Sequence, residues 1–146
     1  MRVTTPIGLT LDLAPDWCDV TDDLPGENVP FTLGREQGSG ALQFSTGIYH
    51  SGRVPDPSPE DLRRLLLDFA SSRDLGDPSD LQITDAPVRL AAATFRPDSF
   101  VRVWYISDGR SIALVTLTCE STPEPSELTD CEQMLRSVHF ESTNVA

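Results

Sequence analysis

FVRVWYISDGRSIALVTLTC, the stretch from Phe100 to Cys119, decides the fold of this 146-residue chain. It holds two runs rich in β-branched and aromatic residues, which favour strands, and Asp108-Gly109 separates them. An Asp-Gly pair suits a two-residue hairpin turn, because both central residues of that turn need a positive φ. We therefore predict an antiparallel hairpin. The stretch contains no recognisable catalytic motif.

A two-residue turn divides the hairpin side chains into two faces, because successive side chains of a strand point to opposite sides. One face is almost wholly apolar and is predicted to be core; it pairs Tyr105 with Ile112, Val103 with Leu114 and Val101 with Thr116. The other face pairs Trp104 with Ala113, Arg102 with Val115 and Phe100 with Leu117. The two strands do not alternate apolar and polar residues, as strands of a sheet with one solvent-exposed face do. Both are therefore expected to be covered at least in part.

Arg102 and Trp104 lie two residues apart on one face, so the guanidinium can stack on the indole. One interpretation is an arginine at the edge of the core that extends its charged end to water. The other is a binding surface, because Trp and Arg are common anchors of interfaces. As a hypothesis we assign the partner-binding residues as Phe100, Arg102, Trp104, Val115 and Leu117. Whether a helix or a partner covers this face is left open by the sequence.

Two helices are predicted outside the hairpin. Ser58 and Pro59, followed by two acidic residues, form a helix start, because Ser accepts hydrogen bonds from unpaired N–H groups and Pro fits the first position. Apolar residues then recur at helical spacing, and the helix is expected to end near Arg73. A second amphipathic helix is predicted to start at Pro125 or Ser126.

The remaining segments complete an α+β fold, in which an antiparallel sheet of about six strands packs with two main helices. Besides the hairpin, strands are expected at residues 7–13, 29–36, 41–49, 81–84 and 88–95. Trp17 is expected to fold back onto the core, and a short closing segment, Ser137-Val138-His139-Phe140, follows the second helix. Residues 1–140 are predicted to form a single domain and residues 141–146 a frayed tail.

The charge balance limits the classes of partner. Eleven basic residues, all arginine, against 23 acidic ones give a net charge of −12. The absence of lysine excludes Schiff-base chemistry and a P-loop lysine, although a GC-rich genome explains the same bias without function. An acidic chain disfavours nucleic acid, which needs clustered basic residues. It is compatible with a basic protein partner.

The sequence predicts a cytoplasmic protein with no membrane span, because no apolar run of about 18 residues is present and the N-terminus lacks a secretory signal. Three cysteines are too few for a disulfide scaffold, and we interpret Cys18, Cys119 and Cys131 as small apolar residues. A disulfide between Cys119 and Cys131 is left open.

Known catalytic and metal-binding patterns are absent from the sequence. His50 and His139 are the two histidines, and the spacing of a structural zinc site is missing. The acidic residues between Asp19 and Glu27 lack the spacing of a calcium-binding loop, so they are interpreted as a solvated loop. We therefore expect no catalytic residue, no cofactor and no metal.

The order of elements resembles the Mog1/PsbP-like group, which includes DcrB-like bacterial domains. The resemblance rests on the opening strand before Ala14-Pro15-Asp16-Trp17, the helix at residues 59–72, the hairpin at residues 100–119 and the closing residues 131–140. It covers most of the chain as a pattern, without a specific signature. It implies an α/β/α sandwich around an antiparallel sheet, used mainly for binding, and supplies no catalytic residues.

We therefore expect a non-enzymatic, cytoplasmic protein-binding domain of a bacterium. An immunity protein that neutralises a toxin, or a chaperone or adaptor for a secreted effector, would fit, with a basic protein as partner. A homodimer is also compatible with the sequence. The alternative is a small enzyme or ligand-binding domain with a pocket between sheet and helix.

Overall fold

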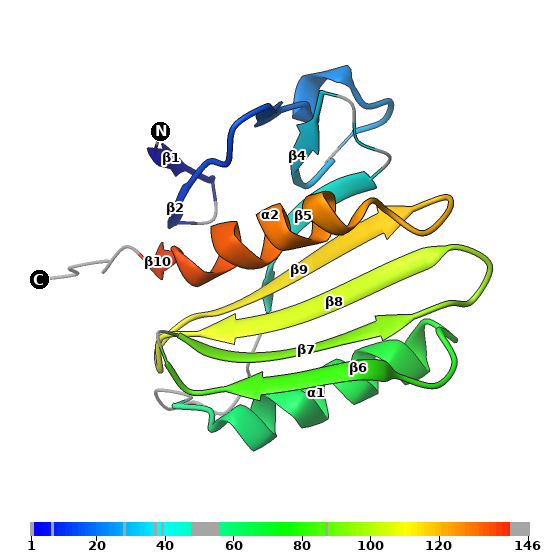
Figure 1. Cartoon of the computed structure of the whole chain (residues 1–146). Coiled ribbons are helices and arrows are strands. Elements are labelled where there is room, and N and C mark those ends of the chain that lie inside the picture. The colour runs from blue at the N-terminus through cyan, green and yellow to red at the C-terminus, as the bar shows by residue number, and fades with distance from the viewer. Residues whose placement is uncertain are drawn as a thin grey trace, which may run out of the picture.

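A computed structural model describes residues 2–6, 8–27, 29–36, 38, 40–47, 56–86 and 88–140, and it shows an α+β fold (Figure 1). In chain order the elements are β1 (Arg2–Thr4), β2 (Leu9–Asp12), β3 (Trp17–Asp19), the 3-10 helix η1 (Thr21–Asp23), β4 (Phe31–Arg35), β5 (Gly40–Gly47), α1 (Pro59–Ser72), β6 (Ser79–Thr84), β7 (Arg89–Phe95), β8 (Phe100–Ser107), β9 (Ile112–Cys119), α2 (Pro125–Arg136) and β10 (His139–Phe140). The predicted tail, residues 141–146, lies outside the described residues.

The strands form two antiparallel sheets rather than one sheet of about six strands. The larger sheet has seven strands in the order β3-β4-β5-β9-β8-β7-β6, and the smaller has three in the order β1-β2-β10. The expected first strand is shorter than predicted, because a turn at Gly8, with φ +84°, separates β1 from β2. β1 and β3 were not predicted, since three residues are too short to show alternation.

The hairpin of β8 and β9 is present, but its register differs from the prediction. Ser107 pairs with Ile112, so four residues connect the strands instead of two. The carboxylate of Asp108 accepts hydrogen bonds from the backbone N–H groups of Arg110 (2.9 Å) and Ser111 (2.8 Å), which stabilises this longer loop. Trp104 consequently lies opposite Val115 rather than Ala113. The shift is two residues, which leaves every side chain on its predicted face.

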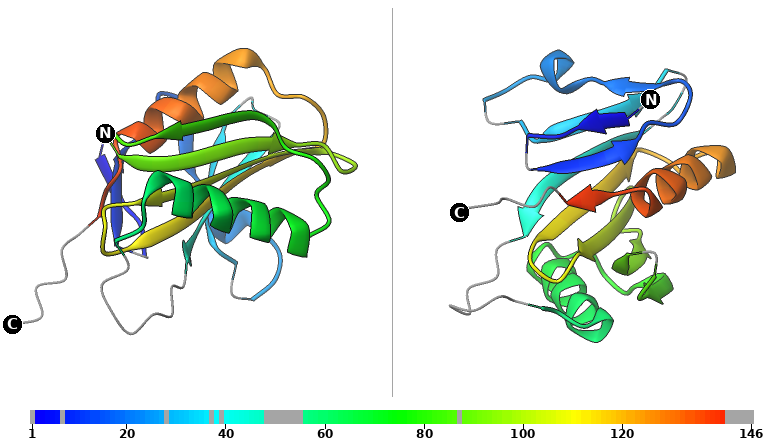
Figure 2. Two further views of the ribbon diagram at one scale, coloured as in Figure 1. Left: turned by 90° about the horizontal axis from the view of Figure 1, so that it is seen from below. Right: turned by 90° about the vertical axis from the view of Figure 1, so that its left-hand side faces the viewer.

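The two helices pack on opposite faces of the β7–β8 region of the large sheet (Figure 2). Leu62, Leu66 and Ala70 of α1 pack with the face that includes Ala91 and Val103. The apolar residues of α2 pack on the other face with the larger cluster, Leu9, Leu11, Trp17, Leu33, Leu42, Phe44, Leu90, Ala92, Phe100, Trp104, Ile106, Ala113, Val115, Leu117, Cys119, Cys131, Met134, Leu135 and Val138. Both faces of the hairpin are therefore covered, as predicted.

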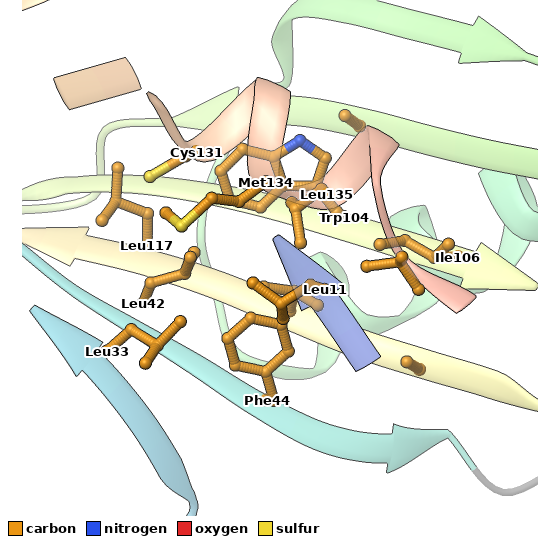
Figure 3. Close-up of a cluster of buried hydrophobic side chains, with 14 of the residues drawn as sticks. Leu11, Leu33, Leu42, Phe44, Trp104, Ile106, Leu117, Cys131, Met134 and Leu135 are labelled. Atoms are coloured by element: carbon orange, nitrogen blue, oxygen red, sulfur yellow. The ribbon is translucent and has the colours of Figure 1, made fainter. Parts of the chain in front are cut away.

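The small sheet adds a second cover on the α2 side. Leu11 of β2 lies among the side chains of α2, β5 and β8 in the larger cluster (Figure 3). The closing residues His139 and Phe140 pair with Thr10 and Leu9 of β2. Trp17 folds back onto the core as expected, with 4% of its surface exposed, and its indole N–H donates to the Asp130 carboxylate at 2.9 Å.

Helix α1 begins at the predicted residues. Ser58 accepts a hydrogen bond from the Asp61 backbone N–H at 3.1 Å, and the Asp61 carboxylate accepts one from the Ser58 backbone N–H at 2.9 Å. This reciprocal pair satisfies two N–H groups that the helix itself leaves unbonded. The hydrogen bonds from Ser58 lower the pKa of Asp61. Arg73 follows the helix as its C-cap.

Replacing the capping hydroxyl should destabilise the protein. Ser58→Ala removes the acceptor for the Asp61 backbone N–H, which we expect to lower the free energy of unfolding by about 1 kcal/mol. Ser71→Ala, at an exposed position near the end of the same helix, is the control. Urea denaturation followed by circular dichroism measures both. An equal loss in the two variants would show that the cap contributes nothing.

Candidate functional site

The face predicted to bind a partner is instead covered by the chain's own helix α2. All five residues assigned to it are buried: Phe100, Arg102, Trp104, Val115 and Leu117. Together with residues of α2, the four apolar ones belong to the larger core cluster. They offer no surface to a partner in this structure. Sequence reasoning located the face but could not tell which element folds over it.

Arg102 reaches across β7 to the edge strand β6 and upward to α2. Its Nε donates to the Glu132 carboxylate of α2 at 2.9 Å. Its Nη1 donates to the Thr94 hydroxyl of β7 at 2.8 Å and to the Asp80 carbonyl oxygen at 3.1 Å. Its Nη2 donates to the Gln82 side-chain oxygen at 3.3 Å. With 2% of its side chain exposed, the guanidinium thus has a partner on each of its three nitrogens.

Trp104 completes this network. The Arg102 guanidinium lies 5.5 Å from the indole centroid, within cation–π distance, so the stacking predicted from the two-residue spacing is present. The indole N–H donates to the second oxygen of Glu132 at 3.4 Å. The Asp80 carboxylate also lies 3.5 Å from Arg102. The network joins β6, β7, β8 and α2 through one buried charge.

Removing the Arg102 charge should lower the free energy of unfolding more than removing an exposed charge does. Arg102→Met leaves Glu132 without its cation, and we expect unfolding to become easier by about 3 kcal/mol. Adding Glu132→Leu should recover part of that loss, because the two residues interact directly. The control is Arg2→Met, which breaks an exposed ion pair with Asp12 and should cost less than about 1 kcal/mol. Chemical denaturation measures the free energy of unfolding of each single variant and of the double variant. Similar losses of stability at Arg102 and Arg2 would contradict the expectation.

Two hollows share Arg136 in their lining, and one of them borders the Arg102 network. One, of about 340 Å³, lies between α2 and β6; its lining includes Arg102, Glu132 and Arg136. The other, of about 440 Å³, lies at the end of α2 beside the turns of the large sheet; its lining includes Arg89, Arg136 and His139. Several of the charges are engaged within the chain: Arg89 donates to the Asp56 carboxylate at 2.6 Å, which raises the pKa of Arg89.

The histidine, cysteine and acidic side chains of the described residues do not gather into a metal-binding cluster. No group of three or more His, Cys, Asp or Glu side chains in these ranges is placed to hold a metal ion. His139 lies exposed on β10, whereas His50 falls outside the described residues. Cys18, Cys119 and Cys131 are thiols rather than disulfide partners. Burial raises the pKa of the Cys131 thiol, which keeps it in its unreactive protonated form.

The cysteines should differ sharply in reactivity. Cys18 is exposed, while Cys119 and Cys131 are buried. We expect an aromatic disulfide reagent to modify Cys18 alone in the folded protein and all three thiols after denaturation. Absorbance of the released thiolate gives the count, and Cys18→Ser is the control that should abolish the native-state reaction. Recovery of a single thiol after denaturation would instead indicate that Cys119 and Cys131 are bridged.

The exposed large apolar side chains of the described residues are Leu81 and Ile83, with 42% and 38% of their surface exposed. Both lie on β6, which is an edge of the seven-stranded sheet. Three acidic residues flank this strand, Asp74, Asp77 and Asp85, and a fourth, Asp80, lies within it. Sequence reasoning predicted the strand but not its position at the edge, because strand order depends on contacts far apart in the chain. We call Leu81, Ile83 and these acidic residues the β6 surface.

Comparison with known proteins shows a likeness of fold. No family model and no curated protein matches the sequence. A crystal structure of a protein from Bacteroides thetaiotaomicron VPI-5482 superposes with a TM-score of 0.54 at 12% sequence identity, over 97% of this chain and 48% of that chain. The chain thus spans about half the length of that protein. At this identity the likeness concerns the fold alone.

The structure bears on membrane association in one respect. Within the described ranges, neither helix has the length and apolar content that are needed to cross a bilayer.

Proposed function

We propose that this chain is a non-enzymatic protein-binding domain of a bacterium, acting in the cytoplasm, whose β6 surface binds a basic protein. The observation that supports it most directly is the location of Leu81 and Ile83. These two exposed apolar side chains lie together on an open sheet edge instead of being scattered. Exposed edge strands are templates for another chain unless they are blocked.

The charge of the chain favours a basic partner. The net charge is −12, and acidic residues stand at both ends of β6. An acidic surface attracts a basic protein over several ångströms and speeds its association. An immunity protein that neutralises a basic toxin, or a chaperone or adaptor for a secreted effector, would both use such a surface.

We further propose that the fold is the α/β/α sandwich of the Mog1/PsbP-like group. Three features support this assignment: an antiparallel sheet, one helix on each face of its β7–β8 region, and a closing helix followed by β10. The three-stranded sheet on the α2 side is an addition to that plan. Domains of this group serve mainly in binding, which agrees with the proposed role.

A small-ligand site between sheet and helix is the second candidate. The hollow between α2 and β6 supports it, because a volume of about 340 Å³ is in the range of small-molecule sites. Its buried charge, however, is already saturated by Glu132, Thr94, Asp80 and Gln82. A ligand would have to replace these contacts, so we rank protein binding first.

Site-specific photocrosslinking in the cells that produce the protein tests the leading proposal. A photoreactive amino acid at position 83 should capture one basic protein, because Ile83 is one of the two exposed apolar residues of the β6 surface. The same amino acid at position 18, exposed on the opposite edge strand β3, is the control and should not capture it. Mass spectrometry identifies the product. Equal capture at both positions, or capture of an acidic protein, would overturn the proposal.

A further inference from the structure

We infer that the partner binds as an additional strand, antiparallel or parallel to β6, and that the segment it contributes alternates apolar and basic residues. This inference rests on the proposed function and specifies how the β6 surface is occupied. In strand addition, main-chain hydrogen bonds supply much of the affinity and alternate side chains supply the specificity. No other strand of the described part of the chain pairs with the outer edge of residues 81–84.

The first half of β6 is closed to pairing by a bulge. The register of β6 on β7 shifts between Ser79 and Gln82, and Asp80 has φ +50°. Arg102 holds this distortion in place, since it binds the Asp80 carbonyl oxygen at 3.1 Å and the Gln82 side chain at 3.3 Å. Bulges twist an edge and block its extension. Main-chain pairing of the added strand is therefore confined to residues 81–84, and Asp80 borders this stretch.

The two faces of this short edge differ in chemistry. Ile83 aligns with Ala91, which belongs to the cluster under α1, so Ile83 and Leu81 lie on the α1 face. Gln82 and Asp80 lie on the α2 face, where both contact Arg102. Cross-strand neighbours stabilise a sheet when apolar groups meet each other and opposite charges meet.

The side chains of the partner strand should complement the two faces of β6. Apolar side chains of the added strand would pack on Leu81 and Ile83. An intervening side chain at the end of this stretch would lie next to Asp80, whose carboxylate side chain is 73% exposed and is thus accessible to a second cation. A basic residue there would form an ion pair with the Asp80 carboxylate. The alternation of apolar and basic residues follows directly from the period of two along a strand.

A second copy of the chain is the competing occupant, and the charges disfavour it. Symmetric antiparallel pairing about Gln82 would place Leu81 of each copy opposite Ile83 of the other. It would also bring the Asp80 side chain of each copy close to Asp85 of the other copy, twice by symmetry. Each chain has a net charge of −12, and such chains repel each other. A basic segment gains the apolar contacts without this repulsion.

Selection of displayed random peptides on the immobilised protein tests the inference. We expect the enriched peptides to alternate apolar residues with Lys or Arg. In fluorescence polarisation, Ile83→Lys should weaken such a peptide about tenfold or more, as expected for loss of an anchor. Cys18→Lys makes the same charge change on the other edge strand and should leave affinity unchanged. Hydrogen exchange of the backbone amides in residues 81–84 should slow on binding.

The outcomes separate the mode of binding from the function. If reordering a selected peptide into an apolar block and a basic block preserves its affinity, while Ile83→Lys still weakens it, strand addition is wrong and the proposed function stands. If no peptide is enriched, or if Ile83→Lys leaves binding unchanged, both are overturned. A dimer in size-exclusion chromatography that Ile83→Lys converts to a monomer would identify a second copy as the occupant and reject the basic segment.

Discussion

Three strands of the large sheet and helix α2 meet at one buried guanidinium. Arg102 has 2% of its side chain exposed, and a buried charge is tolerated only when its donors are satisfied. Glu132 on α2, Thr94 on β7 and Asp80 with Gln82 on β6 provide those acceptors. The requirement fixes where α2 lies above the sheet and shapes the edge strand, so one charge orients elements distant in the sequence.

This arrangement decides which surface remains available. Because α2 and the small sheet cover the Trp104 face and α1 covers the opposite face, the apolar residues of the hairpin are all used inside the chain. Among the described residues, the large apolar side chains that stay exposed are Leu81 and Ile83 of β6. Arg102 lies on the hairpin face that was predicted to bind a partner. It also contacts Asp80 and Gln82, at the bulge that limits the open edge of β6 to a few residues.

Several features could be predicted because they depend on neighbours in the chain. The start of α1 follows from the hydrogen bonds between Ser58 and Asp61, three residues apart. The faces of the hairpin follow from alternation, and they survive even though the loop is longer than predicted. The register of the hairpin could not be predicted. Asp108 stabilises a four-residue connection through hydrogen bonds from Arg110 and Ser111, which composition alone does not reveal. β1 and β3 escaped prediction because each is too short to show a pattern.

The α+β class, both helices, the two-faced hairpin and the acidic charge follow from the amino-acid sequence, because each is a property of local pattern or of composition. Long-range packing places α2 over the Arg102 face, pairs β10 with β2 and leaves β6 at the edge of the sheet. These outcomes depend on contacts between residues far apart in the chain. The binding site that we propose therefore lies not on the hairpin, which is the most distinctive sequence, but on an edge strand that the sequence does not distinguish.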